Sequence, residues 1–244
     1  GPLGVLFMSF ANVLRAAAAL TRLVGVADLP LPAPSDRPFA LPLGVTVAGL
    51  SHHYPDGPEV LHDVSVSIPA GHSLAVVGES GAGKTTLAAL VGGVFPASSG
   101  AIALGEDAVD GLDPRAVRRR VAVVTQEVHT FAGPLAEDLR LAKPDAANDD
   151  LVHALRAVGA HDWVLALPDG LETRVGVGGH PLTVDQAQQL ALARIVLVAP
   201  PIVVLDEATA EAGSAGARAL ERSADAVTAG RTAVVVAHRL TQAR

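Results

Sequence analysis

Apolar and polar positions alternate in some parts of the chain and form unbroken apolar runs in others. Residues 45–50 and 64–68 alternate, as strands with one face in a hydrophobic core do. Three short runs are almost wholly apolar, which is typical of strands covered on both faces: residues 73–77, 201–206 and 232–237. Helical stretches separate these strands, so the pattern predicts an α/β protein.

Residues 1–27 precede this pattern and favour a helix. Residues 12–26 have an apolar side that Arg15 and Arg22 interrupt, whereas Gly1-Pro2 is set aside as a candidate remnant of a removed tag. The apolar run at residues 5–10 is far shorter than the ~20 residues that a membrane span needs. Two interpretations stay open: a packing helix, or the cytosolic end of a longer membrane helix.

Residues 28–44 contain five prolines. Because proline fixes φ and has no backbone N–H, this stretch can form neither a regular helix nor a central strand. We expect an extended, semi-rigid linker. The sequence therefore predicts a boundary here and a domain that spans residues 45–244.

Composition and charge narrow the range of functions. Half of the residues are apolar and the mean hydropathy is +0.39, which excludes a disordered chain. The net charge is −7 and the only basic run, residues 118–120, is interpreted as a solvated helix end, so nucleic acid is not expected as a partner. Cysteine is absent, which fits a reducing cytosol and leaves no disulfide or thiolate metal site.

The most specific motif follows the strand at residues 73–77. Residues 78–85, the phosphate loop, match G-x4-G-K-[ST] at every fixed position. Glycines let successive backbone N–H groups point at phosphate oxygens, while Lys84 reaches the β and γ phosphates and Thr85 binds Mg²⁺. The residues expected to contact a nucleoside triphosphate are Gly78, Glu79, Ser80, Gly81, Ala82, Gly83, Lys84, Thr85 and Thr86.

Five further residues at strand ends add to this site. Asp206 and Glu207 end a buried strand, where an aspartate can hold Mg²⁺ and a glutamate can polarise an attacking water. Gln126 and His238 each follow a strand, at positions suited to water and to a γ-phosphate. Tyr54, the only tyrosine, lies 24 residues before the phosphate loop and is a candidate for stacking on adenine. An isolated Asp-Glu pair is more often the start of a helix, and a lone histidine at a strand end is usually structural; after a phosphate loop the functional interpretation of the Asp-Glu pair is favoured.

Residues 45–244 resemble the nucleotide-binding domain of an ABC transporter of the exporter type, in which membrane helices precede the ATPase. The resemblance covers about four-fifths of the chain. It implies catalytic roles for Glu207, His238 and Gln126, and Mg²⁺ binding by Thr85, Gln126 and Asp206. Residues 131–135 resemble the segment of the family that faces the coupling helices of the membrane domain, and residues 173–176 resemble the X-loop of exporters.

The resemblance also implies an architecture, that of an ABC-type P-loop NTPase. A mixed β-sheet core would carry the phosphate loop, an antiparallel β subdomain would carry Tyr54, and a helical subdomain would occupy about residues 134–199. The family continues beyond the switch histidine with another strand and helices. Since the sequence ends six residues after His238, the resemblance implies a domain cut short at its C-terminal end.

Residues 182–186, the signature segment, depart from the family pattern Leu-Ser-Gly-Gly-Gln: they are Leu182, Thr183, Val184, Asp185 and Gln186. In the family this segment opens a helix that approaches the ATP of the neighbouring subunit. A carboxylate ~5 Å from a phosphate charge is repelled by about 3 kcal/mol at an effective dielectric of ~20. Asp185 can also be interpreted as a helix cap. Residues 210–213 depart from the family pattern as well, so the sequence predicts a degenerate signature.

The resemblance thus implies a domain that binds and hydrolyses MgATP to power export of a small molecule, drug, lipid or peptide. Its partners would be the transmembrane domain of the same transporter and a different ABC ATPase domain with an intact signature, at the cytoplasmic face of the cell membrane. Two alternatives stay open: a soluble ABC ATPase without a transport role, and a regulatory nucleotide-binding module with weak catalysis.

Overall fold

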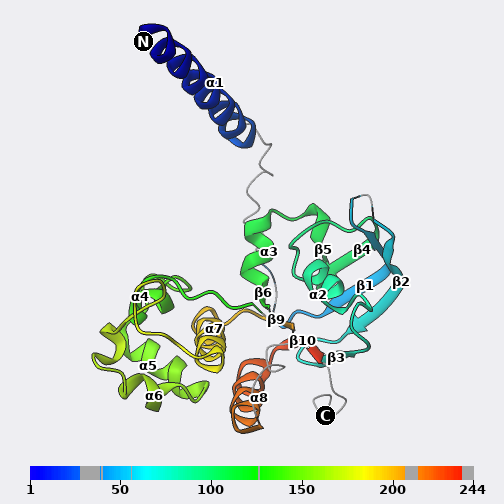
Figure 1. The fold of residues 1–244 in the computed structure, drawn as a ribbon. Coiled ribbons are helices and arrows are strands. Elements are labelled where there is room, and N and C mark those ends of the chain that lie inside the picture. Colours follow the sequence, from blue (N-terminus) through cyan, green and yellow to red (C-terminus); the bar gives the residue numbers. More distant parts are fainter. Residues whose placement is uncertain (28–38, 40, 56, 126, 207–213, 238–244) are drawn as a thin grey trace. The chain divides into compact units, whose positions relative to one another are not determined.

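A computed structural model describes residues 1–27, 39, 41–55, 57–125, 127–206 and 214–237. The chain divides into two compact units, Gly1–Pro34 and Ser35–Arg244 (Figure 1). The first unit contains helix α1 (Pro2–Ala27), which spans nearly the whole stretch expected to be helical; its first residue is a proline, which is well tolerated in the first turn of a helix. None of the helices in the described parts of the chain is long and apolar enough to cross a membrane. The predicted linker lies mostly outside the described residues.

The phosphate loop belongs to a four-stranded parallel sheet in the second unit. Its strands are β3 (Ser73–Val77), β6 (Val121–Val124), β9 (Ile202–Asp206) and β10 (Thr232–Ala237), in the order β3-β10-β9-β6. All pairings between these strands are parallel, so the mixed sheet expected for the core is not what the described strands form. The antiparallel strands form a separate sheet.

Burial differs between the central and the edge strands of the parallel sheet. All five residues of β9 are buried, as the apolar run predicted. The same prediction for β3 is wrong, because β3 is an edge strand of the described sheet and Val77 is 41% exposed. A run of apolar residues does not reveal which strand ends up at an edge.

The second sheet is antiparallel and confirms the predicted β subdomain. It contains β1 (Val45–His53), β2 (Glu59–Ile68), β4 (Ser99–Leu104) and β5 (Asp107–Ala108), in the order β2-β1-β4-β5. Together with helices α2 (Lys84–Val91) and α3 (Pro114–Arg120), it buries one hydrophobic cluster that also includes residues of the parallel sheet. The antiparallel sheet therefore packs close to the phosphate loop.

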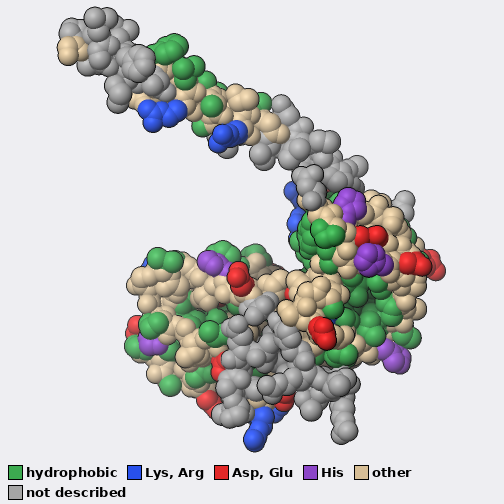
Figure 2. Space-filling model, turned by 45° about the vertical axis from the view of Figure 1, so that its right-hand side comes forward, with side chains coloured by type: hydrophobic (Ala, Val, Ile, Leu, Met, Phe, Trp, Pro, Cys, Tyr) green, Lys and Arg blue, Asp and Glu red, His purple; other side chains and the backbone are tan. Residues whose placement is uncertain are grey.

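Arg120 corrects the interpretation of residues 118–120 as a solvated helix end. Its side chain is fully buried at the end of α3, where it forms an ion pair of 2.8 Å with Asp107 and lies 4.9 Å from the centre of the Phe39 ring. Arg118 and Arg119 are exposed. Figure 2 shows one face of the second unit, on which ionised side chains are scattered over the surface.

A group of helices forms the predicted helical subdomain, separate from the antiparallel sheet in Figure 1. It contains α4 (Leu135–Arg140), α5 (Asn148–Ala157), α6 (His161–Leu165) and α7 (Val184–Val198), with the short strands β7 (Gly133–Pro134) and β8 (Arg174–Val175). A second hydrophobic cluster fills it and extends to β9 and to helix α8 (Ser214–Thr228). Short 3-10 turns lie at Val109–Gly111 and Gly170–Glu172.

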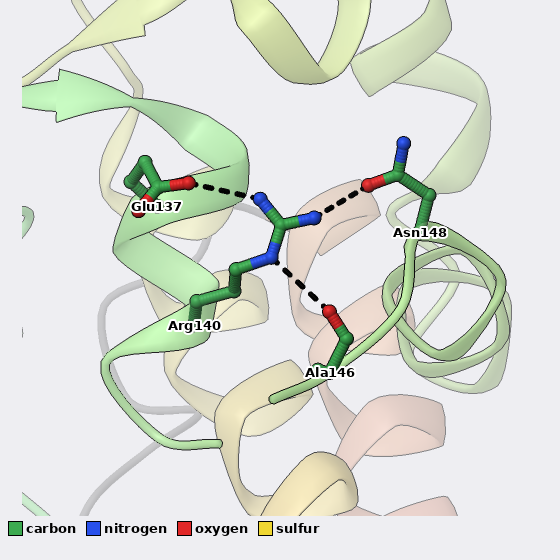
Figure 3. A network of polar contacts seen from close by, with 4 residues as sticks. All are labelled: Glu137, Arg140, Ala146 and Asn148. Carbon is green, nitrogen blue, oxygen red and sulfur yellow. Dashed lines mark hydrogen bonds and ion pairs between the residues drawn. The ribbon is translucent and has the colours of Figure 1, made fainter. Parts of the chain in front are cut away.

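Polar contacts hold these helices in a fixed arrangement. Arg140 of α4 donates hydrogen bonds to Glu137 Oε1 (2.9 Å), to Asn148 Oδ1 (2.6 Å) and to the Ala146 carbonyl (3.1 Å), and so joins α4 to the start of α5 (Figure 3). The indole N–H of Trp163 donates to Gln189 Oε1 at 2.8 Å, which joins α6 to α7. The helix that begins with the signature segment is thus bound to its neighbours by polar as well as apolar contacts.

Candidate nucleotide-binding site

The phosphate loop connects the end of β3 to the start of α2. Gly81 and Gly83 have φ of +82° and +83°, values that residues with a side chain rarely adopt. A Cβ on Gly83 would lie 2.7 Å from Leu61 Cδ2 and 3.0 Å from the Val60 carbonyl oxygen. Glycine is therefore required at position 83 by both backbone conformation and space, and the loop passes directly over β2.

The N-terminus of α2 is open to an anion. Gly83 precedes the first residue of the helix, no side chain caps its N–H groups, and its first turn holds no acidic residue. Free N–H groups and the positive end of the helix dipole both favour a bound phosphate. The loop and the helix together form the cradle that the motif predicts.

Lys84 places an ammonium group inside this cradle. Its residue is only 7% exposed, and Nζ donates hydrogen bonds to the carbonyl oxygens of Gly78 (3.0 Å) and Glu79 (2.9 Å). Among the described contacts, the third N–H of the ammonium has no protein partner. A buried cation with an unused donor favours an anionic ligand, because a charged hydrogen bond offsets the desolvation.

Two oxygen atoms from different elements meet at the end of the phosphate loop. The Thr85 hydroxyl donates to Asp206 Oδ1 at 3.2 Å, and Asp206 ends β9 with only 4% of its surface exposed. Hydroxyl and carboxylate oxygens are the ligands that Mg²⁺ prefers in proteins. These residues therefore fit a magnesium-bound polyphosphate.

Tyr54 lies at the edge of the same site. Its hydroxyl forms a hydrogen bond of 3.1 Å with Thr86 Oγ1 in α2, while its ring meets His52 and Phe95 edge-on with centroids 5.1 and 5.8 Å away. The side chain remains 44% exposed, so part of the ring is available for stacking. The sequence predicted Tyr54 but not its ring partners, because His52 and Phe95 come close only through the fold.

Gln126, Glu207 and His238 lie outside the described residues, so their roles stay predictions. The strands that precede them, β6, β9 and β10, are parallel neighbours whose carboxyl ends lie at one edge of the sheet. β3, which leads into the phosphate loop, ends at the same edge. In open α/β sheets this edge is where ligands bind.

The start of α7 is built differently from the start of α2. Thr183 is the N-cap: its Oγ1 accepts a hydrogen bond from the Gln186 N–H (3.2 Å), and Gln186 Oε1 accepts one from the Thr183 N–H (2.9 Å). This capping box shows that the interpretation of Asp185 as the cap is wrong. Asp185 is half-buried in the first turn, and Val184 beside it is 55% exposed.

Comparison with known proteins identifies the family. The sequence matches the family described as "ABC transporter" over residues 61–210, more than half of the chain. The chain therefore belongs to the ABC transporter family. Membership of this family implies nucleotide binding and agrees with the P-loop fold and with the cradle around Lys84.

Three relatives illustrate the similarity. The chain is 34% identical over 245 residues to an ATP-dependent lipid A-core flippase of Legionella pneumophila. This match covers 98% of this chain and 41% of that protein. It is 39% identical to ATP-binding cassette sub-family B member 6 of Homo sapiens (77% of this chain, 22% of that protein). It is 35% identical to ABC transporter B family member 1 of Arabidopsis thaliana (82% and 16%). The chain thus spans less than half the length of each of these relatives.

Proposed function

We propose that this chain binds and hydrolyses MgATP and powers export by an ABC exporter, with a small molecule, drug, lipid or peptide as the transported substrate. One observation carries the first part: the Lys84 ammonium lies inside a glycine-lined loop at the open N-terminus of α2, and the next residue, Thr85, is hydrogen-bonded to Asp206. The names of two relatives, a lipid A-core flippase and an ABC transporter of the B family, support the second part.

Each residue of the site has a role in this proposal. Lys84 and the loop N–H groups bind the β and γ phosphates, and Thr85 and Asp206 hold Mg²⁺ together with Gln126. The exposed part of the Tyr54 ring stacks on the adenine. Bound Mg²⁺ would supply charge neutralisation at the phosphates. Glu207 orients and activates the attacking water, and His238 contacts the γ-phosphate. Catalysis of this kind consists of positioning and electrostatic stabilisation.

The signature segment supports a partner that differs from this chain. A helix N-terminus binds a phosphate through free N–H groups and its positive dipole. Here Asp185 adds a negative charge to the first turn, at a position where the family pattern has glycine. Two identical copies would pair two poor segments. We therefore infer a second ABC ATPase domain with an intact signature, which would complete the nucleotide site of this chain.

The remaining parts of the proposal follow from the architecture of exporters. A transmembrane domain of the same transporter is the second partner, and the domain lies at the cytoplasmic face of the cell membrane. A soluble ABC ATPase and a weakly catalytic regulatory module are the alternatives to this proposal. The first is disfavoured by the transport names of the relatives, and no described contact favours the second.

ATP hydrolysis by the complete transporter tests the catalytic assignment. Glu207→Gln removes the proposed base and should lower the hydrolysis rate by roughly 10²–10³-fold while MgATP still binds. Glu106→Gln, at an exposed turn between β4 and β5, removes the same charge away from the site and should stay within about twofold of the parent rate. Unchanged hydrolysis in Glu207→Gln would contradict the assignment.

A further inference from the structure

A buried carboxylate connects the helical subdomain to the segment that follows β6. Asp138 lies on α4 with its side chain only 1% exposed. Its Oδ1 accepts a hydrogen bond from the Phe131 backbone N–H at 2.8 Å, and its Oδ2 accepts one from Arg194 Nη2. One side chain therefore binds both the backbone of residues 129–131 and helix α7.

Arg194 makes the complementary pair of contacts from α7. Its Nη1 donates to the His129 carbonyl oxygen at 3.1 Å, while its guanidinium lies 6.0 Å from the centre of the Phe131 ring. Among the described hydrogen bonds, those to Asp138 and Arg194 are the ones that reach the backbone of residues 129–131. We call these two side chains the clamp.

The two side chains of the clamp depend on each other energetically. Each ion is largely removed from water, so the loss of one partner leaves the other charged and unpaired, which is strongly unfavourable. Arg194 is also geometrically specific, because its planar group donates from Nη2 to a carboxylate and from Nη1 to a carbonyl at once. The clamp therefore fixes the position of residues 129–131 against α7 rather than merely attracting them.

The two ends of this connection lie beside elements that the proposed function assigns to nucleotide binding. Residues 127–131 follow the carboxyl end of β6, and the Thr125 hydroxyl donates to the Glu127 carbonyl at 2.9 Å. α7 begins with the signature segment, ten residues before Arg194, or about 15 Å along the helix axis. A displacement at the strand end would reach the start of α7 through one ion pair and one stiff helix.

We propose that Asp138 and Arg194 are positioning residues that make residues 129–131 and α7 move as one body. Nucleotide binding at the edge of the parallel sheet then reorients the signature segment toward the neighbouring subunit. This inference rests on the proposed function, since it explains how that function uses the helical subdomain. Neither Asp138 nor Arg194 contacts the nucleotide in this proposal.

The chain provides a matched control on the same helix as Asp138. Arg140 also forms an ion pair and three hydrogen bonds, but all of them stay within the helical subdomain (Figure 3). Loss of Arg140 removes the same charge and at least as many hydrogen bonds without touching residues 129–131. If the clamp had only a structural role, substitution of Arg194 and substitution of Arg140 would have the same effect on ATP hydrolysis.

The first test separates nucleotide binding from turnover in the complete transporter. Arg194→Gln and Asp138→Asn should lower kcat for ATP hydrolysis about tenfold and leave the Kd for MgATP within about twofold, whereas Arg140→Gln should change neither. Arg194→Lys keeps the charge but cannot donate in two directions from a plane, so it should recover only part of kcat. Equal losses in Arg194→Gln and Arg140→Gln, or a matching change in Kd, would overturn the proposal.

The second test measures the coupling without hydrolysis. Nitroxide labels at Glu127→Cys and Leu165→Cys, both at exposed positions of this cysteine-free sequence, report the distance between the segment and the helical subdomain. We expect one narrow distance distribution with and without MgATP, and a broad one in Arg194→Gln even without nucleotide. A narrow distribution in Arg194→Gln would refute the clamp. Absence of MgATP binding by the parent protein would instead refute the proposed function.

Discussion

The starts of α2 and α7 are two helix N-termini with opposite electrostatic character. α2 begins after a glycine, with no side-chain cap, no acidic residue in its first turn and the Lys84 ammonium beside it. α7 begins with a threonine–glutamine capping box and carries Asp185 in its first turn. The comparison teaches that a helix N-terminus attracts an anion when no carboxylate in its first turn cancels the positive end of the helix dipole.

The size of the difference follows from simple electrostatics. A helix N-terminus carries roughly half a positive elementary charge, and one carboxylate in the first turn more than cancels it. The capping box stabilises α7 by giving hydrogen-bond acceptors to the backbone N–H groups of Thr183 and Gln186. The family pattern Leu-Ser-Gly-Gly-Gln has a hydroxyl and a glutamine at the same two positions, so the weaker attraction for a phosphate comes from the Asp185 carboxylate and not from the box.

The largest expected effect comes from removing the cation at the start of α2. Lys84→Ala should weaken MgATP binding about 100-fold, because it deletes a charged donor from a buried cradle. Isothermal titration calorimetry with MgATP measures this directly.

The other lysine of the chain serves as the control. Lys143 is 42% exposed at its side chain and lies 3.8 Å from Asp150, far along the chain from the phosphate loop. Lys143→Ala should leave MgATP binding unchanged within experimental error. Equal weakening by both substitutions would show that net charge, and not the cradle, governs binding.

The backbone of the α2 start can be tested with a pair of glycines. Gly83→Ala combines a positive φ with a Cβ 2.7 Å from Leu61 Cδ2, and should lower the free energy of unfolding by about 2 kcal/mol. Gly81→Ala has nearly the same φ but nothing within 4 Å of its Cβ, and should cost about half as much. Urea denaturation compares the two, and equal costs would remove the steric argument.

The charge on the α7 start can be removed without changing its shape. Asp185→Asn should raise the affinity for the nucleotide bound against this segment about tenfold, a screened fraction of the Coulomb repulsion. Asp149 is the matched control, since it occupies the same second helical position in α5. Binding of fluorescent ATP to the assembled pair of domains measures both variants; an equal effect of Asp149→Asn would contradict a local role for Asp185.

The smallest effect concerns the cap of α7. Thr183→Ala should lower the free energy of unfolding by about 1 kcal/mol, because the Gln186 N–H loses its acceptor. Thr183→Ser keeps the hydroxyl and should restore most of this stability. Thermal unfolding followed by circular dichroism distinguishes the three proteins, and a stable Thr183→Ala variant would show that the box contributes little.

The features that could be predicted from the sequence are those formed by residues that follow one another in the chain. The phosphate loop, the strand that ends in Asp206 and the departure at Asp185 were all visible in short segments of sequence. Gln126, Glu207 and His238 stay predictions of this local kind. Such segments specify their own chemistry, because the motif and the element that carries it are continuous in the chain.

The parts that were not predictable depend on distant residues. Arg120 belongs to a basic run that reads as exposed, yet its pairing with Asp107 and Phe39 buries it. Arg194 stands alone in the apolar stretch Ala-Leu-Ala-Arg-Ile, a signal that marks a special residue but not its partner Asp138, 56 positions away. Burial of β3 was overestimated for the same reason, since edge and centre are properties of the whole sheet.

The asymmetry between the starts of α2 and α7 is tested most directly by counting the ATP molecules that a pair of domains occludes. The number of ATP molecules trapped per pair of domains should be close to one when this chain is assembled with a partner that carries Leu-Ser-Gly-Gly-Gln, and close to zero for two copies of this chain. Two identical copies that trap and rapidly hydrolyse two ATP molecules would contradict the asymmetry between the starts of α2 and α7.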